Sequence, residues 1–191
     1  MDNKRERIFS ATEKIIAAEG LQGLSMQKIA TEAEISAGTI YRYFTDKEAL
    51  IFELRKNVLC KVSRYILADC QNGDLKQKFQ RIWFNMVDFA SQRTPTTLSY
   101  EQYIHLPGID SDPHQTFEKT IFGGLHQFFE TGKAQDKFHR LSNKILFSIS
   151  MEPAMALARS IRRGQIKYDE NELEIACEIC WKTLLKSTPS T

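Results

Sequence analysis

The chain has 191 residues, of which 42% are hydrophobic and 26% are charged, and its formal net charge at pH 7 is +2. This length holds a small domain and one of ordinary size with a real core, which argues against a disordered tail protein. The near balance of charge argues against nonspecific coating of nucleic acid, although it leaves room for a local basic patch.

The cysteine count and the apolar pattern favour a reducing compartment. Four cysteines do not make a disulfide framework at this length, and no signal pattern opens the chain. No apolar run approaches the roughly 18 residues of a membrane span. We therefore expect a cytoplasmic protein without membrane contact. No phosphate loop, nucleophile elbow or carboxylate pair favours an enzyme, and we expect no cofactor or metal.

The first 50 residues predict three helices. Apolar residues recur at helical spacing from about residue 3 to residue 19, Ser25 can cap a helix over 26–33, and Ser36 can cap a short helix that Phe44 closes. Two short helices joined by a tight turn are a helix-turn-helix. Thr45 and Glu48 have the spacing of a capping box, which predicts that a long helix begins at once and reaches about residue 69.

The short helix has two contrasting faces. At about 100° per residue, Ile40 and Phe44 share one face, and Gly38, Thr39 and Arg42 share the opposite one. A helix anchored in this way can lie in the major groove of DNA, where arginine reads base edges. The tyrosines that would reach phosphates on either side are Tyr41 and Tyr43.

Other residues of this segment are candidates for DNA contact. Lys4, Arg5, Arg42 and Lys47 could converge as a basic patch. Two further candidates, for phosphate or a base edge, are Ser25 and Gln27, although a plain cap and a surface residue explain them equally well.

The rest of the chain predicts a helical body. The expected helices span about 47–69, 74–90, 96–106, 114–131, 136–163 and 171–186, with a kink at Pro153 in the fifth of them. The helix over 74–90 has a broad aromatic face, which is either core or the wall of an apolar pocket. The candidate ligand-binding residues are Phe79, Trp83, Met86, Tyr100, Tyr103, Phe117 and Ile121.

The last helix is apolar on two sides, which predicts a partner. Cys180 lies on one stripe, and Ile175 and Ile179 lie nearly opposite, so one side can serve the body and the other a second subunit. Small residues at 154 and 158 of the preceding helix would let helices approach closely. The candidate interface residues are Ala154, Ala158, Ile175, Ile179 and Cys180.

The segment from Arg5 to Leu54, and above all GTIYRYFTDKEAL, resembles the DNA-binding segment of the tetracycline-repressor (TetR) family of bacterial regulators. The resemblance implies an all-α fold of about nine helices, with a DNA-binding head at 1–50 and a ligand-binding, dimerising body at 51–191. It implies a homodimeric repressor of a palindromic operator that a small molecule releases, with the last two helices of each subunit forming a four-helix interface. The family's DNA contacts fall on Ala37, Gly38, Thr39, Tyr41, Tyr43 and Lys47.

Two alternatives remain open at this point. A thiol-based redox regulator would use Cys177 and Cys180, or Cys60 and Cys70, as its sensor. Cysteines at this spacing inside an apolar helix stripe are more often small core residues. A structural nucleoid protein would bind DNA without sequence preference.

Overall fold

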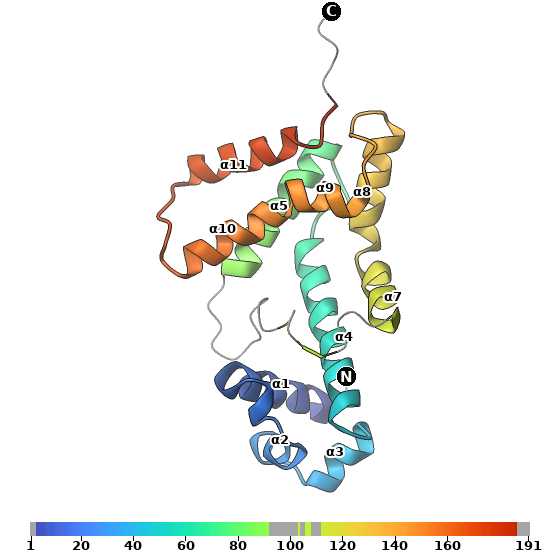
Figure 1. Cartoon of the computed structure of the whole chain (residues 1–191), viewed down its shortest axis with the longest axis vertical. Coiled ribbons are helices and arrows are strands. Elements are labelled where there is room, and N and C mark those ends of the chain that lie inside the picture. The colour runs from blue at the N-terminus through green and yellow to red at the C-terminus, as the bar shows by residue number, and fades with distance from the viewer. Residues whose placement is uncertain (1–2, 92–102, 104–105, 108–111, 187–191) are drawn as a thin grey trace, which may run out of the picture. The chain divides into compact units, whose positions relative to one another are not determined.

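The computed structural model describes residues 3–91, 103, 106–107 and 112–186. Its helices are α1 (Asn3–Glu19), α2 (Met26–Glu32), α3 (Ala37–Tyr43), α4 (Lys47–Ile66), α5 (Leu75–Ser91), α7 (Asp112–Ile121), α8 (Gly123–Ala134), α9 (Asn143–Ser150), α10 (Glu152–Arg162) and α11 (Glu170–Lys182), with a 3-10 turn, η1 (Leu21–Gly23), after α1 (Figure 1). The predicted all-helical class is confirmed. The short helix predicted over 96–106 lies almost wholly outside the described residues.

The chain divides into two compact units, each made from two stretches of sequence. Residues 1–60 and 93–118 form the first, here called the head unit, and residues 61–92 and 119–191 form the second, here called the body unit. The predicted boundary between sequence domains at residue 50 stays a prediction. The described residues 103, 106–107 and 112–118 belong to the head unit, although in sequence they lie between the two stretches of the body unit.

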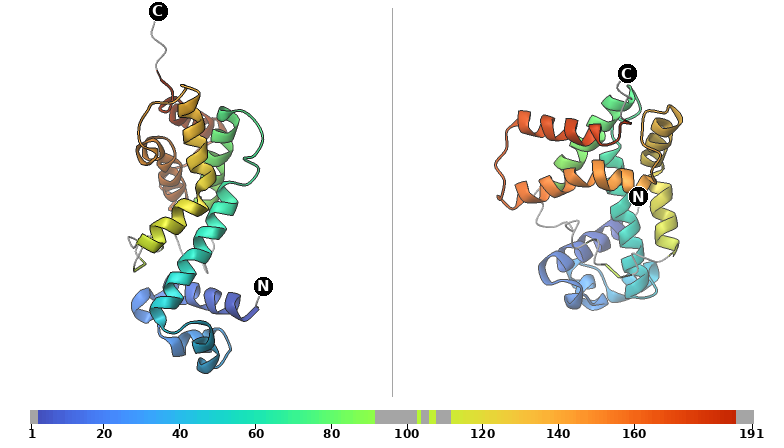
Figure 2. Two further views of the ribbon diagram at one scale, coloured as in Figure 1. Left: turned by 90° about the vertical axis from the view of Figure 1, so that its right-hand side faces the viewer. Right: turned by 45° about the horizontal axis from the view of Figure 1, so that its top comes forward.

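The head unit has its own small core. Figures 1 and 2 show α1, α2 and α3 gathered around the first turns of α4. The apolar residues that recur at helical spacing point inward, as their periodicity predicts. The fully buried ones are Ile8, Ile29, Ile40, Leu50 and Leu54.

The cap of α4 differs from the predicted one. Asp46 Oδ1 accepts the N–H of Ala49 at 2.7 Å, and Thr45 Oγ1 donates to the same carboxylate at 3.2 Å. The predicted capping box from Thr45 was therefore wrong by one residue. A carboxylate is the stronger acceptor at the positive end of a helix dipole. The Ala49 N–H accordingly lowers the pKa of Asp46.

The body unit is built around aromatic side chains of α5. Phe79 and Trp83 are fully buried, and the Phe79 ring lies 5.4 Å from that of Trp181 on α11, centroid to centroid. Asp74 begins α5 by accepting the N–H of Gln77 at 2.8 Å, which confirms the predicted cap.

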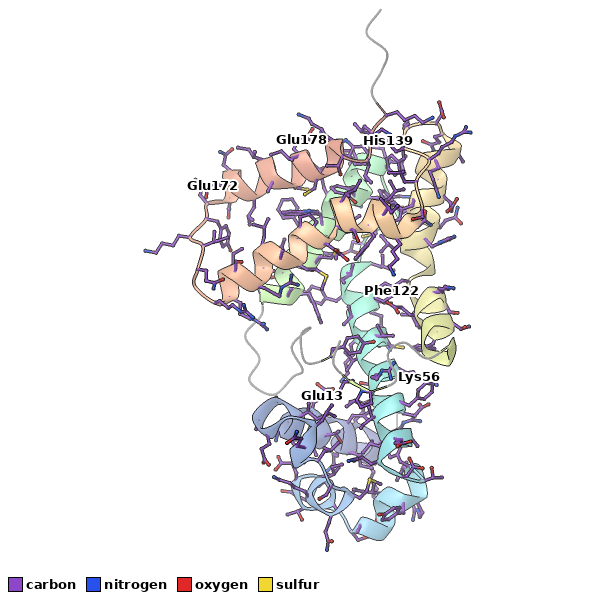
Figure 3. The ribbon with its side chains drawn as sticks, viewed as in Figure 1. Glu13, Lys56, Phe122, His139, Glu172 and Glu178 are labelled. Carbon is purple, nitrogen blue, oxygen red and sulfur yellow. The ribbon has the colours of Figure 1, made fainter. Side chains whose placement is uncertain are left out.

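The helix predicted over 114–131 is two helices. α7 ends at Ile121 and α8 begins at Gly123, with Phe122 between them, as the labelled side chain in Figure 3 shows. Two consecutive glycines follow the break, and glycine is a weak helix former. Gly132 does not end the helix as predicted. A Cβ there would lie 2.0 Å from the Phe138 ring, so this glycine permits close packing.

The helix predicted over 136–163 is also divided. Ser142 caps α9 by accepting the N–H of Ile145, and α10 follows after Met151 with Pro153 in its first turn. Proline suits a first turn because its missing N–H would have no partner there, so it starts a new helix here. The residues before α9 turn instead, and Phe138 forms an antiparallel bridge to Leu185.

Candidate nucleic-acid interface

Serine caps hold both short helices of the helix-turn-helix. Ser25 Oγ accepts the N–H of Lys28 at 3.2 Å, and Ser36 Oγ accepts the N–H of Thr39 at the same distance. Both predicted caps are confirmed. The Ser36 hydroxyl also shares a hydrogen bond of 2.9 Å with the Thr39 hydroxyl. This second bond fixes the Thr39 side chain before any DNA contact.

The two faces of α3 are separated as predicted. Ile40 is 0% exposed and Phe44 is 3% exposed, and the Phe44 ring lies 5.6 Å from the Phe9 ring of α1. Tyr41 is 55% exposed on the outer side. The other residues of the outer side divide as follows: Gly38 and Arg42 are exposed, and Ala37, Thr39 and Tyr43 are half-buried.

Most basic side chains in the helices of the head unit are occupied by acidic partners. The ion pairs in this region include Arg5–Glu53, Arg7–Glu34, Lys14–Glu32 and Lys28–Glu19. Arg42 and Lys47, by contrast, form no ion pair with any described residue; the Arg42 guanidinium lies only over the Tyr43 ring, 6.0 Å from its centroid. These two exposed cations at α3 and the start of α4 are therefore available to an external anion.

The remaining candidates for DNA contact have different surroundings. Lys4, Ser25 and Gln27 are exposed. Arg5 pairs with Glu53 at 2.5 Å, and its guanidinium lies over the Phe9 ring, 5.4 Å from the centroid. In the free protein Arg5 thus contributes to packing of the head unit. The predicted convergence of Lys4, Arg5, Arg42 and Lys47 stays a prediction.

The candidate ligand-binding residues do not fall in one unit. Phe79, Trp83 and Met86 are packed in the core of the body unit. Tyr103 and Phe117 belong to the head unit. Ile121 belongs to the body unit, and Tyr100 lies outside the described residues. The single pocket expected from these residues stays a prediction.

The candidate interface residues divide between core and surface. Ala154 and Ala158 are 0% exposed within the body unit, so they are not available to a partner, which corrects their assignment. Their small side chains allow α10 to pack closely on α5. Cys180 is largely buried beside them. Ile175 and Ile179 are 52% and 59% exposed, as a partner-facing stripe requires.

Sequence reasoning missed further exposed apolar residues. Ile145 and Ile149 on α9 are 48% and 40% exposed, and Leu141 just before α9 is 40% exposed. The Thr183 hydroxyl donates to the Ile149 carbonyl at 3.4 Å, which brings the end of α9 to the end of α11. The available signal was the spacing of four residues between Leu141, Ile145 and Ile149, which the prediction of a single helix over 136–163 did not use.

Three of the four cysteines, Cys70, Cys177 and Cys180, do not have the surroundings of a redox sensor. Burial raises the pKa of the Cys177 thiol to about 12, and burial also raises the pKa of Cys180 and Cys70. A neutral thiol is a poor nucleophile, so these groups react slowly with oxidants at neutral pH. Among the described residues no cluster of three or more His, Cys, Asp or Glu could hold a metal, and no helix could span a membrane.

Comparison with known proteins agrees with this geometry over nearly the whole chain. A family model described as bacterial regulatory proteins, tetR family, matches residues 8–54, and one described as tetracyclin repressor-like, C-terminal domain, matches residues 74–185. The chain is 32% identical over 184 residues to an uncharacterized HTH-type transcriptional regulator of Haemophilus influenzae, with 95% of each chain covered.

Solved structures give the same result. A TetR-family regulator from Vibrio parahaemolyticus is 34% identical, with a TM-score of 0.86 over 97% of this chain and 100% of that one. One from Haemophilus influenzae is 30% identical, with a TM-score of 0.83 over 96% of this chain and 97% of that one. The chain therefore belongs to the TetR family and is a DNA-binding transcriptional regulator of the helix-turn-helix type.

Proposed function

We propose that this regulator is a dimeric repressor that reads a palindromic operator and is released by a small, mostly apolar ligand. The observation that carries the proposal is that Arg42 on the outer side of α3 and Lys47 at the start of α4 are exposed and form no ion pair with any described acidic group. Two such helices in a dimer would enter successive major grooves about 34 Å apart.

Gly38 supports close approach of α3 to DNA. It lies on the exposed side of a helix, where glycine is less stable than alanine by about 1 kcal/mol. A Cβ at this position would come no closer than 4.0 Å to the nearest neighbour, the Ser36 hydroxyl. The fold therefore has no need of glycine here, whereas a backbone lying against base edges does.

We predict that Gly38→Ala raises the thermal stability and weakens operator binding. The added methyl group favours the helix by about 1 kcal/mol but fills the space next to the base edges. Calorimetry and binding to an operator selected from random-sequence DNA measure the two effects. Gly123→Ala in α8 is the control, since a Cβ there meets nothing within 4 Å and should leave DNA binding unchanged. Full operator affinity in Gly38→Ala would contradict the close approach.

We predict that replacing Arg42 and replacing Lys47 have different effects on DNA binding. Asp46 already accepts N–H groups at the start of α4, so Lys47 would meet phosphate through its ammonium group, which carries no sequence information. Lys47→Ala should weaken operator and random DNA alike. Arg42→Ala should cost about 1–3 kcal/mol on the operator alone if its contact with guanine is bidentate.

The measurement for this pair is binding to operator and random DNA at one salt concentration. Lys167→Ala is the control for a lost positive charge, since Lys167 is an exposed lysine in the connection between α10 and α11. Equal losses on both DNAs for Arg42→Ala would assign it to the backbone.

The dimer proposal is supported by exposed apolar residues on α9 and α11 and by an apolar groove on α10 and α11. Ile145 and Ile149 of α9 and Ile175 and Ile179 of α11 are exposed, and Ile179 also lines the groove. The groove is lined by Pro153, Ala156, Leu157, Ser160, Ala176, Ile179 and Cys180. A large apolar patch on a protein surface is typical of an interface, and a second copy presents a matching one.

We predict that Ile179→Glu gives monomers. A carboxylate buried against the apolar partner surface without a counter-charge is strongly unfavourable, and operator affinity should fall with the dimer. Light scattering measures the mass. Ile166→Glu is the matched control, because Ile166 is 40% exposed in the connection between α10 and α11 but does not line the groove. A dimeric Ile179→Glu variant would place the interface elsewhere.

The route from a ligand to the DNA is supported by contacts within the head unit. Arg55 on α4 is 1% exposed and donates a hydrogen bond to the carbonyl of Pro107. Lys56, labelled in Figure 3, lies over the Phe52 and Phe117 rings, 5.2 Å and 5.3 Å from their centroids. Both Pro107 and Phe117 fall within the region that the C-terminal family model matches. A ligand that displaces these two residues would change their contacts with α4 and so its position in the head unit.

We predict that a releasing ligand acts through the aromatic residues of α5 and α7. A panel of medium-chain alkyl and aromatic compounds is screened for release of the operator, and each active compound is tested on Trp83→Phe and Phe117→Leu. Both variants should bind the operator normally and respond less. Trp83→Phe loses part of the ring surface proposed to contact the ligand, and Phe117→Leu loses the ring that contacts Lys56 on α4. An active compound that releases both variants as well as the wild type would place the effector site elsewhere.

A further inference from the structure

The turn between α2 and α3 contains a residue in an unfavourable conformation. Glu34 has a φ of +51°. The Ile35 N–H bonds to the Ala30 carbonyl at 3.0 Å and the Glu34 N–H to the Thr31 carbonyl at 3.1 Å, which together form a Schellman motif at the end of α2. This position normally takes glycine, because a Cβ is crowded in the left-handed region.

One arginine of α1 binds this residue at two points. Arg7 Nη2 donates to the Glu34 carboxylate at 3.0 Å and to the Glu34 carbonyl oxygen at 3.3 Å. The contact with the carboxylate requires a side chain that glycine lacks. The contact with the carbonyl oxygen requires residue 34 to keep its left-handed backbone conformation, since that conformation sets the direction of the carbonyl group. The strained backbone and the side chain that causes the strain are thus held by the same guanidinium group.

The direction of α3 depends on this turn. Only Ile35 separates Glu34 from Ser36, the cap of α3, and α3 has seven residues with Ile40 as its fully buried one. A change in the backbone torsion angles at residue 34 therefore changes the direction of the whole α3 helix. The Glu34 side chain is 85% exposed, so the ion pair contributes little to global stability, and its effect is on geometry.

We propose that Arg7 is a positioning residue for DNA reading, which acts through Glu34 to hold α3 at the angle that fits the major groove. The inference rests on the proposed reading of an operator by α3. It assigns to Arg7 no contact with DNA, although Arg7 is a cation in the DNA-binding segment. Its loss should therefore reduce discrimination between sequences more than overall attraction to DNA.

The first test compares Arg7→Gln with Lys14→Gln. Lys14 also lies on α1 and pairs with Glu32 of α2 at 3.2 Å, so its replacement removes the same charge and a similar ion pair without touching the turn. Binding to a selected operator and to random DNA is measured at one salt concentration. Arg7→Gln should lower the operator-to-random ratio about fivefold, the size expected when an exposed ion pair is lost from both heads of a dimer. Lys14→Gln should leave the ratio unchanged.

The second test uses Glu34→Gly, which removes the strain and the carboxylate together. The melting temperature should stay or rise, because glycine adopts the left-handed region freely, while the operator-to-random ratio falls. A purely structural role would move both quantities in the same direction. An unchanged ratio in Arg7→Gln or in Glu34→Gly would overturn the inference and leave the operator proposal standing. A wild-type protein without sequence preference would overturn the operator proposal itself, and this inference with it.

Discussion

The burial of Ile40 and Phe44 is the interaction on which the DNA-binding surface depends. A helix of seven residues is too short to be stable alone in water, because each end leaves backbone groups unpaired and nucleation is costly. α3 exists because these two side chains enter the core formed by α1, α2 and the first turns of α4. On its outer side, Gly38, Tyr41 and Arg42 are exposed and take no part in this core.

The distribution of charge follows from the same arrangement. Seven basic and eight acidic residues in the first 50 leave almost no net charge, and several of the basic side chains form ion pairs with acidic ones. Arg42 on α3 and Lys47 at the start of α4 form no ion pair with a described residue. With so little net charge, long-range attraction to DNA is weak, and the proposed contacts of α3 inside the groove would have to supply most of the specific affinity.

The two compact units share the chain in an interleaved way. The described residues 103, 106–107 and 112–118 belong to the head unit, although the family model of the C-terminal domain covers all of them. The hydrogen bond of Arg55 to Pro107 and the cation-π contact of Lys56 with Phe117 are two of the contacts that join them to α4. A buried charged group is costly unless it is hydrogen-bonded. The hydrogen bond from Arg55 therefore helps to hold Pro107 against α4 within the head unit.

The sequence by itself determined the features that depend on local chemistry. The caps at Ser25, Ser36 and Asp74, the extent of α1 and the two faces of α3 were all predictable, because they depend on hydrogen bonds and spacings within a few residues. The segment that resembles the TetR family lies in this same part of the chain.

Tertiary structure decided what depends on distant neighbours. Ala154 and Ala158 have a small-residue pattern that fits either a partner or the chain's own core, and only the packing of α10 on α5 settles the choice. Gly132 looks like a helix stop in the sequence, yet the Phe138 ring is what requires it. The Arg7–Glu34 contact joins residues 27 positions apart. No local pattern encodes such contacts, since they arise only when separate helices pack together.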